Sequence, residues 1–244
     1  FATAVLVLVT MWMIFEWVPT ERNLGVVQRA LYVHVPLAWI SMVAVGVVAA
    51  ASLMYLITGK RWWDSIALAS AETGVLAGTL MLVTGAIWAK PIWNVWWTWD
   101  AKLTTTAILW FFYVAYLMLR AFAPPGNQAY RMAAVVAVLG AVDVPIVYYA
   151  ADLWRTAHPE LIIGPAADSS GLTSEMGLTL LVSVVAFTSL YIYMLVDRYR
   201  VRQSELEISD LKREMRNYLY APSTSDVPAT AQSLRAAAAE PIGD

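Results

Sequence analysis

Long apolar runs separated by short polar stretches dominate the pattern of hydrophobic and polar positions along this chain. Each run is close to the roughly 20 residues that a helix needs to cross about 30 Å of hydrocarbon. In lipid every backbone polar group must be paired internally, so each run is expected to be helical. The pattern therefore predicts an all-α polytopic membrane protein with six transmembrane helices, at about 1–18, 36–57, 66–88, 104–121, 132–151 and 176–196.

The charges of the connecting segments indicate how these helices are oriented. Short basic loops follow the second and fourth runs, and basic residues also follow the sixth; they include Lys60, Arg61, Arg120, Arg131, Arg198 and Arg200. Loops rich in Lys and Arg face the cytoplasm, so both termini are predicted to be cytoplasmic. The loops predicted to lie together on the outer side are 19–35, 89–103 and 152–175.

The second of these outer loops is unusually rich in tryptophan. Five of the twelve tryptophans of the chain fall between Trp88 and Trp99. Trp and Tyr settle at the headgroup level of many membrane proteins, but that tendency explains five within twelve residues poorly. Indole offers a broad apolar face and one N–H donor, so the cluster predicts a platform for a flat apolar ligand with a polar edge. If Pro91 opens a short helix, the residues that share one face are Trp93, Trp96, Trp97 and Asp100, without Trp99.

The two histidines of the chain lie in the other two outer loops. His34 stands just before Pro36, a residue that suits the first turn of a helix, which places His34 at the membrane surface. His158 stands in a Gly-, Pro- and Ser-rich segment that is typical of a loop. Haem fits two imidazoles beside an indole platform, because its iron takes axial histidine and its ring stacks on indole. Lys90 and Lys102 could contact haem propionates, or equally well lipid headgroups.

Other features of the chain are less decisive. Glu72 and Asp143 fall inside apolar runs, where carboxylates often mark function but could equally be protonated or bonded to a neighbouring helix. Asp100 could act as a helix cap instead of in binding. A formal net charge of −2 gives no indication of nucleic acid, and the lack of cysteine excludes disulfides and thiolate metal sites. A membrane domain at 1–197, a cytoplasmic helical tail at 198–220 and a disordered tail at 221–244 are predicted.

The run WNVWWTWDAKLT, from Trp93 to Thr104, resembles the tryptophan-rich WWD signature of the haem-handling proteins of cytochrome c biogenesis. Six spans with one histidine ahead of the second and another ahead of the sixth resemble specifically the haem exporter protein C family, CcmC. The flanking stretches LYVHVPLAW and LVTGAIWAKPIW are similar to that family too. The resemblance covers about residues 1–197, with a WWD loop at 88–104.

This resemblance implies a protein of the bacterial inner membrane that holds haem b on the periplasmic side. The implied axial ligands are His34 and His158, and the implied platform is Trp93, Trp96, Trp97, Trp99 and Asp100. The implied partners are the haem chaperone CcmE, which receives the haem, the ABC transporter subunits CcmA and CcmB, and the small membrane protein CcmD. Asn94 and Lys102 depart from the glycine and arginine typical of the family. Asn tolerates a left-handed turn, whereas Lys lacks the bidentate fork of Arg.

The function that follows is non-enzymatic haem delivery, in which the acceptor supplies the bond-forming residue. One alternative is a WWD-type cytochrome c haem lyase or synthetase component, which would need extra spans or a large soluble domain. Another is a transporter that moves haem or another solute through its own helix bundle, which would need a polar path along that bundle.

Overall fold

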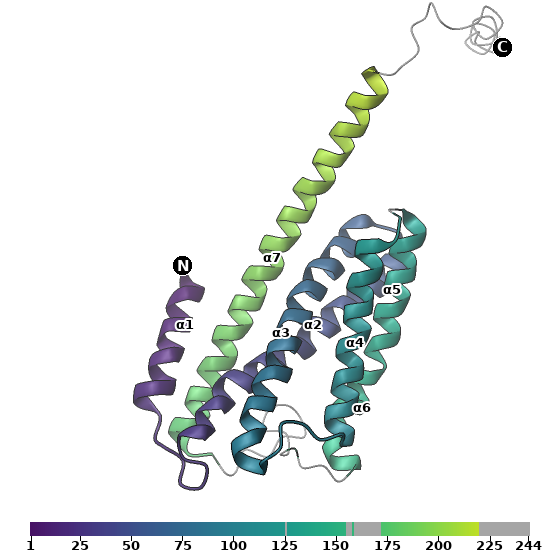
Figure 1. Cartoon of the computed structure of the whole chain (residues 1–244). Coiled ribbons are helices and arrows are strands. Elements are labelled where there is room, and N and C mark those ends of the chain that lie inside the picture. Colours follow the sequence, from purple (N-terminus) through teal and green to yellow (C-terminus); the bar gives the residue numbers. More distant parts are fainter. Residues whose placement is uncertain (125, 155–157, 159–171, 220–244) are drawn as a thin grey trace, which may run out of the picture. The chain divides into compact units, whose positions relative to one another are not determined.

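The structure is a computed structural model that describes residues 1–124, 126–154, 158 and 172–219 (Figure 1). Most of the described residues are helical, and no strand occurs among them. The chain divides into two units, Phe1–Arg200 and Val201–Asp244. The elements in chain order are α1 (Ala2–Trp12), the π-helix η1 (Met13–Trp17), the 3-10 helix η2 (Val26–Ala30), α2 (Leu31–Thr58), α3 (Arg61–Trp93), α4 (Ala101–Phe122), α5 (Asn127–Ala141), α6 (Asp143–Leu153) and α7 (Ser174–Leu219).

Five helical segments in the described part of the chain are long and apolar enough to cross a membrane. They are Val26–Thr58, Arg61–Trp93, Ala101–Phe122, Asn127–Ala151 and Ser174–Leu219. The apolar helix Ala2–Trp17 is shorter than these, about 24 Å at 1.5 Å per residue, compared with about 30 Å of hydrocarbon. The sixth span, at 1–18, and the cytoplasmic position of both termini therefore stay predictions.

Several helix ends differ from those predicted. The second helix begins at Leu31 and not at 36, so Pro36 lies inside it and His34 belongs to its first turns rather than to the preceding loop. The fifth run is not one helix, because α5 ends at Ala141 and α6 begins at Asp143. Pro145 explains this break, since it has no N–H to donate to the carbonyl group four residues earlier.

Small residues let the helices of the first unit pack closely. On α3, Gly74 faces α2 so tightly that an added Cβ would lie 2.7 Å from the Cβ of Ala44. Ser70 Oγ donates to the Ala44 carbonyl oxygen at 3.1 Å and lies 2.8 Å from the hydroxyl of Tyr191 on α7. Because helices in lipid associate through close packing and hydrogen bonds, these contacts hold α2, α3 and α7 together.

Both carboxylates of α3 that face another helix are paired with arginine. Arg120 of α4 makes two hydrogen bonds to Asp64, at 2.6 and 2.9 Å, with side chains that are 4% and 9% exposed. Arg198 of α7 makes two hydrogen bonds to Glu72, at 2.6 and 3.0 Å. Glu72 is thus bonded to a neighbouring helix, which is one of the two structural interpretations that the sequence allowed. The Oδ2 atom of Asp143 is buried and has no hydrogen-bond partner among the described residues.

The second unit contains the end of α7, which continues as helix to Leu219. Arg202 Nη1 and Glu205 Oε2 form an ion pair there at 3.1 Å. The division into a membrane domain at 1–197, a tail at 198–220 and a disordered tail at 221–244 stays a prediction. Residues 220–244 lie outside the described residues.

Candidate functional site

The tryptophan-rich segment, 88–100, consists of the end of α3 and the non-helical connection 94–100 that leads to α4. Helix α3 continues through Pro91 to Trp93 and ends at Asn94, whose backbone is left-handed with φ of 58°. Proline this close to a helix end removes one hydrogen bond and is therefore tolerated. The prediction of a short helix opened by Pro91, with Trp93, Trp96, Trp97 and Asp100 on one face, is therefore wrong. The left-handed backbone at Asn94 agrees with the expectation that asparagine can replace the glycine typical of the family at this position.

Asp100 is the N-cap of α4. Its Oδ1 accepts from the backbone N–H of Leu103 at 3.0 Å, and its Oδ2 accepts from the hydroxyl of Thr98 at 2.8 Å. The capping alternative considered for Asp100 is thus confirmed. The two bonds also fix the last residues of the tryptophan segment against the start of α4.

A large cavity opens at this segment and continues between the helices. Its volume is about 960 Å³, at the upper end of the range typical of small-molecule pockets. The segment contributes Trp93, Trp96, Trp97 and Asp100 to the lining, and the remaining predicted residues in the lining are His34, His158 and Lys102. Farther from the segment the lining is mostly apolar, with Val48 of α2, Ala71 of α3 and Leu109 of α4. The hydroxyl groups of Ser70 and Tyr113 also lie there, and both are hydrogen-bonded within the protein.

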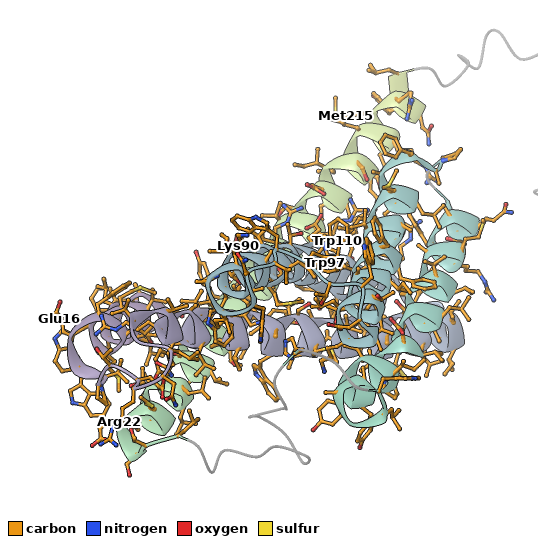
Figure 2. All side chains as sticks on the ribbon, turned by 60° about the horizontal axis from the view of Figure 1, so that its bottom comes forward. Glu16, Arg22, Lys90, Trp97, Trp110 and Met215 are labelled. Carbon is orange, nitrogen blue, oxygen red and sulfur yellow. The ribbon has the colours of Figure 1, made fainter. Side chains whose placement is uncertain are left out.

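The indoles differ in how far they are exposed. Trp96 is 58% exposed and Trp99 is 80% exposed, whereas Trp97 is half-buried. Trp97 and Trp99 meet edge to face, with ring centroids 5.7 Å apart, and Trp99 itself does not line the cavity. Trp97 and Trp110 of α4, both labelled in Figure 2, line the cavity. The N–H groups of Trp88 and Trp97 are buried without an acceptor among the described residues.

His34 is buried, with 7% of its surface exposed, and its ring packs against α3. Its Nδ1 lies 3.2 Å from the hydroxyl oxygen of Thr84, and its ring meets Trp88 edge to face at 5.7 Å. Gly85 leaves room for the ring, since an added Cβ would lie 2.8 Å from His34 Cε1. The residue that the sequence placed in an outer loop is therefore held within the bundle at one end of the cavity.

The two predicted lysines make hydrogen bonds to backbone carbonyl groups. Lys90 Nζ donates to the backbone oxygen of Asn94 at 3.0 Å and to its Oδ1 at 3.1 Å, so it caps the end of α3 (Figure 2). Lys90 is not part of the cavity lining. Lys102 is 8% exposed, and its Nζ donates to the carbonyl oxygen of Val147 on α6 at 2.6 Å.

A comparison with protein families identifies the group of proteins to which this sequence is related. The family model described as "Heme exporter protein C", CcmC, matches residues 1–214. The chain belongs to the CcmC family. It is therefore a membrane protein of a family that takes part in cytochrome c biogenesis.

Curated members of the CcmC family agree with this assignment. The chain is 34% identical to heme exporter protein C of Bradyrhizobium diazoefficiens over 174 residues, 71% of this chain and 66% of that protein. It is 33% identical to heme exporter protein C of Haemophilus influenzae over 195 residues, 80% and 78% of the two chains. A putative cytochrome c biosynthesis ccmC-like mitochondrial protein of Marchantia polymorpha is 31% identical over 158 residues, 65% of each chain. The matches thus span about two thirds of the Bradyrhizobium and Marchantia proteins.

In this CcmC-family chain the cavity gathers both histidines and most of the predicted tryptophan platform, but not Trp99 or Lys90. Sequence reasoning missed the neighbours of His34, which are Thr84, Gly85 and Trp88. Small and hydroxylated residues are common in apolar helices, so the sequence carried no signal that singled out Thr84 and Gly85. In the sequence, Trp88 stands out only as one end of the tryptophan cluster.

Proposed function

We propose that this protein binds haem b in the cavity and delivers it to the periplasmic haem chaperone CcmE during cytochrome c maturation. His34 and His158 are the axial ligands of the iron, and the indoles of Trp93, Trp96 and Trp97 pack against the porphyrin. Trp99 extends this platform through its edge contact with Trp97. The protein positions haem, and the acceptor supplies the residue that forms the covalent bond.

The observation that carries this proposal is the pair of histidines in the lining of one cavity. His34 and His158 are the two histidines of the chain, they are more than a hundred residues apart in sequence, and both line the cavity beside the tryptophan segment. Imidazole is a common axial ligand of haem iron, and indole supplies an apolar face for a flat ring. Two imidazoles with several indoles form a donor set that suits haem better than a small polar solute.

The residues present fit haem in two further respects. The cavity volume, about 960 Å³, is in the range of pockets that hold organic ligands. The described residues contain no group of three His, Asp or Glu side chains that could hold a bare metal ion. Haem does not require such a group, because the porphyrin binds the iron and the protein supplies only the axial ligands. The buried indole N–H groups of Trp88 and Trp97, which have no acceptor among the described residues, are available to a ligand oxygen after a small shift.

Of the two lysines predicted to contact haem propionates, only Lys102 lines the cavity, so only Lys102 keeps that role in this proposal. Lys102 lines the cavity, where its Nζ could donate to a haem propionate in addition to its bond with Val147. Lys90 acts on the platform from outside the lining, since its Nζ lies 6.0 Å from the ring centroid of Trp96. Asp100 supports the platform as the cap of α4.

We place the haem site on the periplasmic side of the inner membrane. The basic residue Lys60 lies between α2 and α3 and Arg61 begins α3, at the ends of these helices far from His34 and Trp93. Since basic loops face the cytoplasm, the tryptophan segment faces the periplasm. The partners in this arrangement are CcmA, CcmB and CcmD, with CcmE as the acceptor.

The two alternatives differ from haem delivery in what they require. A path for a polar solute through the bundle needs polar side chains that are free to bind it. The deep part of the cavity is lined mostly by apolar side chains, and the hydroxyl groups of Ser70 and Tyr113 there are bonded within the protein. Glu72 is paired with Arg198. A haem lyase or synthetase component would form the thioether bonds of a cytochrome itself. Mixing haem-loaded protein with CcmE and with apocytochrome separates these functions, because delivery predicts transfer to CcmE alone.

A haem titration of the purified protein tests the proposal directly. The wild-type protein is expected to give a low-spin Soret spectrum, and His34→Ala with His158→Ala is expected to abolish it. Trp96→Ala is expected to weaken haem retention about tenfold, the loss of roughly 1.4 kcal/mol of ring contact, with the ligation spectrum kept. An unchanged low-spin spectrum in the double variant would show that the histidines are not the ligands.

A further inference from the structure

One face of α3 packs against the imidazole ring of His34. Met81, Thr84, Gly85 and Trp88 follow one another at the spacing of a single helix face. Three of them limit the ring directly: Thr84 through the 3.2 Å contact with Nδ1, Gly85 by close approach to Cε1, and Trp88 by an edge-to-face contact. The ring can therefore neither flip nor rotate without losing a hydrogen bond or striking α3.

The hydrogen bonds of Thr84 determine which partner donates. The hydroxyl oxygen of Thr84 lies 2.8 Å from the carbonyl oxygen of Leu80 and 3.1 Å from that of Met81. A hydroxyl group has one proton, and these carbonyl oxygens can only accept it. The shortest of the three contacts of the hydroxyl oxygen is the one to Leu80, so we assign the hydroxyl proton to that bond. With this assignment the Thr84 oxygen is the acceptor toward His34, and the Nδ1 atom of His34 is the donor.

Gly85 makes this arrangement sterically possible. An added Cβ would lie 2.8 Å from His34 Cε1, closer than side chains normally approach. The distances to Nδ1 and Nε2 would be 3.4 Å and 3.7 Å, which are ordinary contacts. The close approach thus holds the Cε1 edge of the ring against α3, and the Thr84 contact at Nδ1 distinguishes the two nitrogens.

We infer that Thr84 and Gly85 are positioning residues that fix His34 as the Nδ1–H tautomer, with Nε2 as the nitrogen that ligates haem iron. This inference rests on the proposed function. Histidine ligands of metals commonly donate their second ring N–H to a nearby acceptor, which sets the tautomer, orients the ring and makes the ligating nitrogen more basic. Here the acceptor is a threonine hydroxyl of the neighbouring helix, fifty residues away in sequence.

The tautomer can be measured without haem. In protein labelled with ¹⁵N-histidine the ring nitrogens report which of them is protonated, and the chain has two histidines to assign. The signals absent from His34→Ala belong to His34, and they are expected to show a protonated Nδ1. A protonated Nε2 in the neutral ring of His34 would overturn the inference.

Haem binding by matched variants tests the positioning role. Thr84→Val keeps the shape of the side chain but not the acceptor, so haem affinity is expected to fall about tenfold, a small loss for removal of the hydrogen-bond partner of a metal-ligating histidine. The midpoint potential should become more positive, because a less basic ligand stabilises ferric iron less. Thr84→Ser should restore both values. Thr73→Val is the control, because the Thr73 hydroxyl donates to Ala69 within α3 at 3.1 Å.

Gly85→Ala tests the close approach. The added methyl group is expected to push the His34 ring and lower haem affinity at least as much as Thr84→Val does. Gly46→Ala is its control, since a Cβ at Gly46 meets nothing within 4 Å. If Thr84→Val and Gly85→Ala match their controls in affinity and potential, the positioning role is wrong.

These outcomes are distinct from a failure of the proposed function. If the wild-type protein binds haem and the haem spectrum of His34→Ala is the same as that of wild type, then His34 is not a ligand and the proposed function is wrong on this point. The results for the threonine variants do not change that conclusion. If His34→Ala changes the spectrum but Thr84→Val behaves as Thr73→Val, the inference alone fails.

Discussion

The polar residues beside the cavity are held by hydrogen bonds to neighbouring residues of the chain. Both carboxylate oxygens of Asp100 accept hydrogen bonds, one from the first turn of α4 and one from Thr98. The ammonium group of Lys90 binds the carbonyl oxygen of Asn94, where α3 ends. The conformation of the tryptophan segment is therefore fixed at both of its ends before any ligand binds, which lowers the entropy cost of ordering the platform.

Substitution of Asp100 separates its capping role from a role of its charge. Asp100→Ala removes the acceptor of the Leu103 N–H, so the free energy of unfolding should fall by about 1 kcal/mol, and haem retention should fall with it. Asp100→Asn should stay close to wild type in both, because asparagine caps helices as well as aspartate does. Thermal unfolding in detergent and haem titration measure the two effects. Haem loss in Asp100→Asn with unchanged stability would instead point to the charge.

At the residue scale the sequence revealed local contacts but not distant ones. The cap at Asp100 and the left-handed turn at Asn94 could be predicted, because each depends on residues a few positions away. The contact of Thr84 with His34 could not, because helical periodicity shows which residues share a face and not which helix packs against it. The exposures of Trp97 and Trp99 likewise depend on where the chain turns after α3.

At the scale of elements, hydropathy located the interiors of the long helices and missed their ends. Apolar content sets the interior of each membrane helix, whereas caps, prolines and neighbouring helices set its ends. Helix α2 begins before Pro36 because the preceding 3-10 turn, Val26–Ala30, leads directly into it. The break between α5 and α6 lies just ahead of Pro145, which apolar content alone does not reveal.

The two ion pairs of α3 should differ strongly in their effect on stability. Asp64→Asn leaves Arg120 buried without its charge partner, so the free energy of unfolding should fall by about 3–5 kcal/mol. Glu72→Gln affects a pair whose side chains are 32% and 42% exposed, so the loss should stay below about 1 kcal/mol. Unfolding of the two variants in the same detergent measures the difference. Equal losses would mean that burial does not decide the strength of these pairs.

At the scale of the whole molecule, the function depends on which side of the membrane the cavity opens. The segments that line its outer end come from the α1–α2 connection, the α3–α4 connection and His158. In Figure 1 the α1–α2 and α3–α4 connections lie at the same end of the first unit, and the α2–α3 turn lies at the opposite end. Because Lys60 is in that turn and Arg61 directly follows it, the positive-inside rule predicts a cavity that opens to the periplasm.

The absence of cysteine from the sequence makes this orientation directly testable. Arg22, exposed in the α1–α2 connection, and Lys60, exposed in the α2–α3 turn, are suited to single Arg22→Cys and Lys60→Cys variants. In spheroplasts a membrane-impermeant maleimide should label Arg22→Cys at once and Lys60→Cys only after the membrane is permeabilised. Unmodified protein is the control, because it has no thiol to react. The reverse pattern would place the histidines and the tryptophan segment on the cytoplasmic side, where a periplasmic acceptor could not reach haem, and delivery to CcmE would be ruled out.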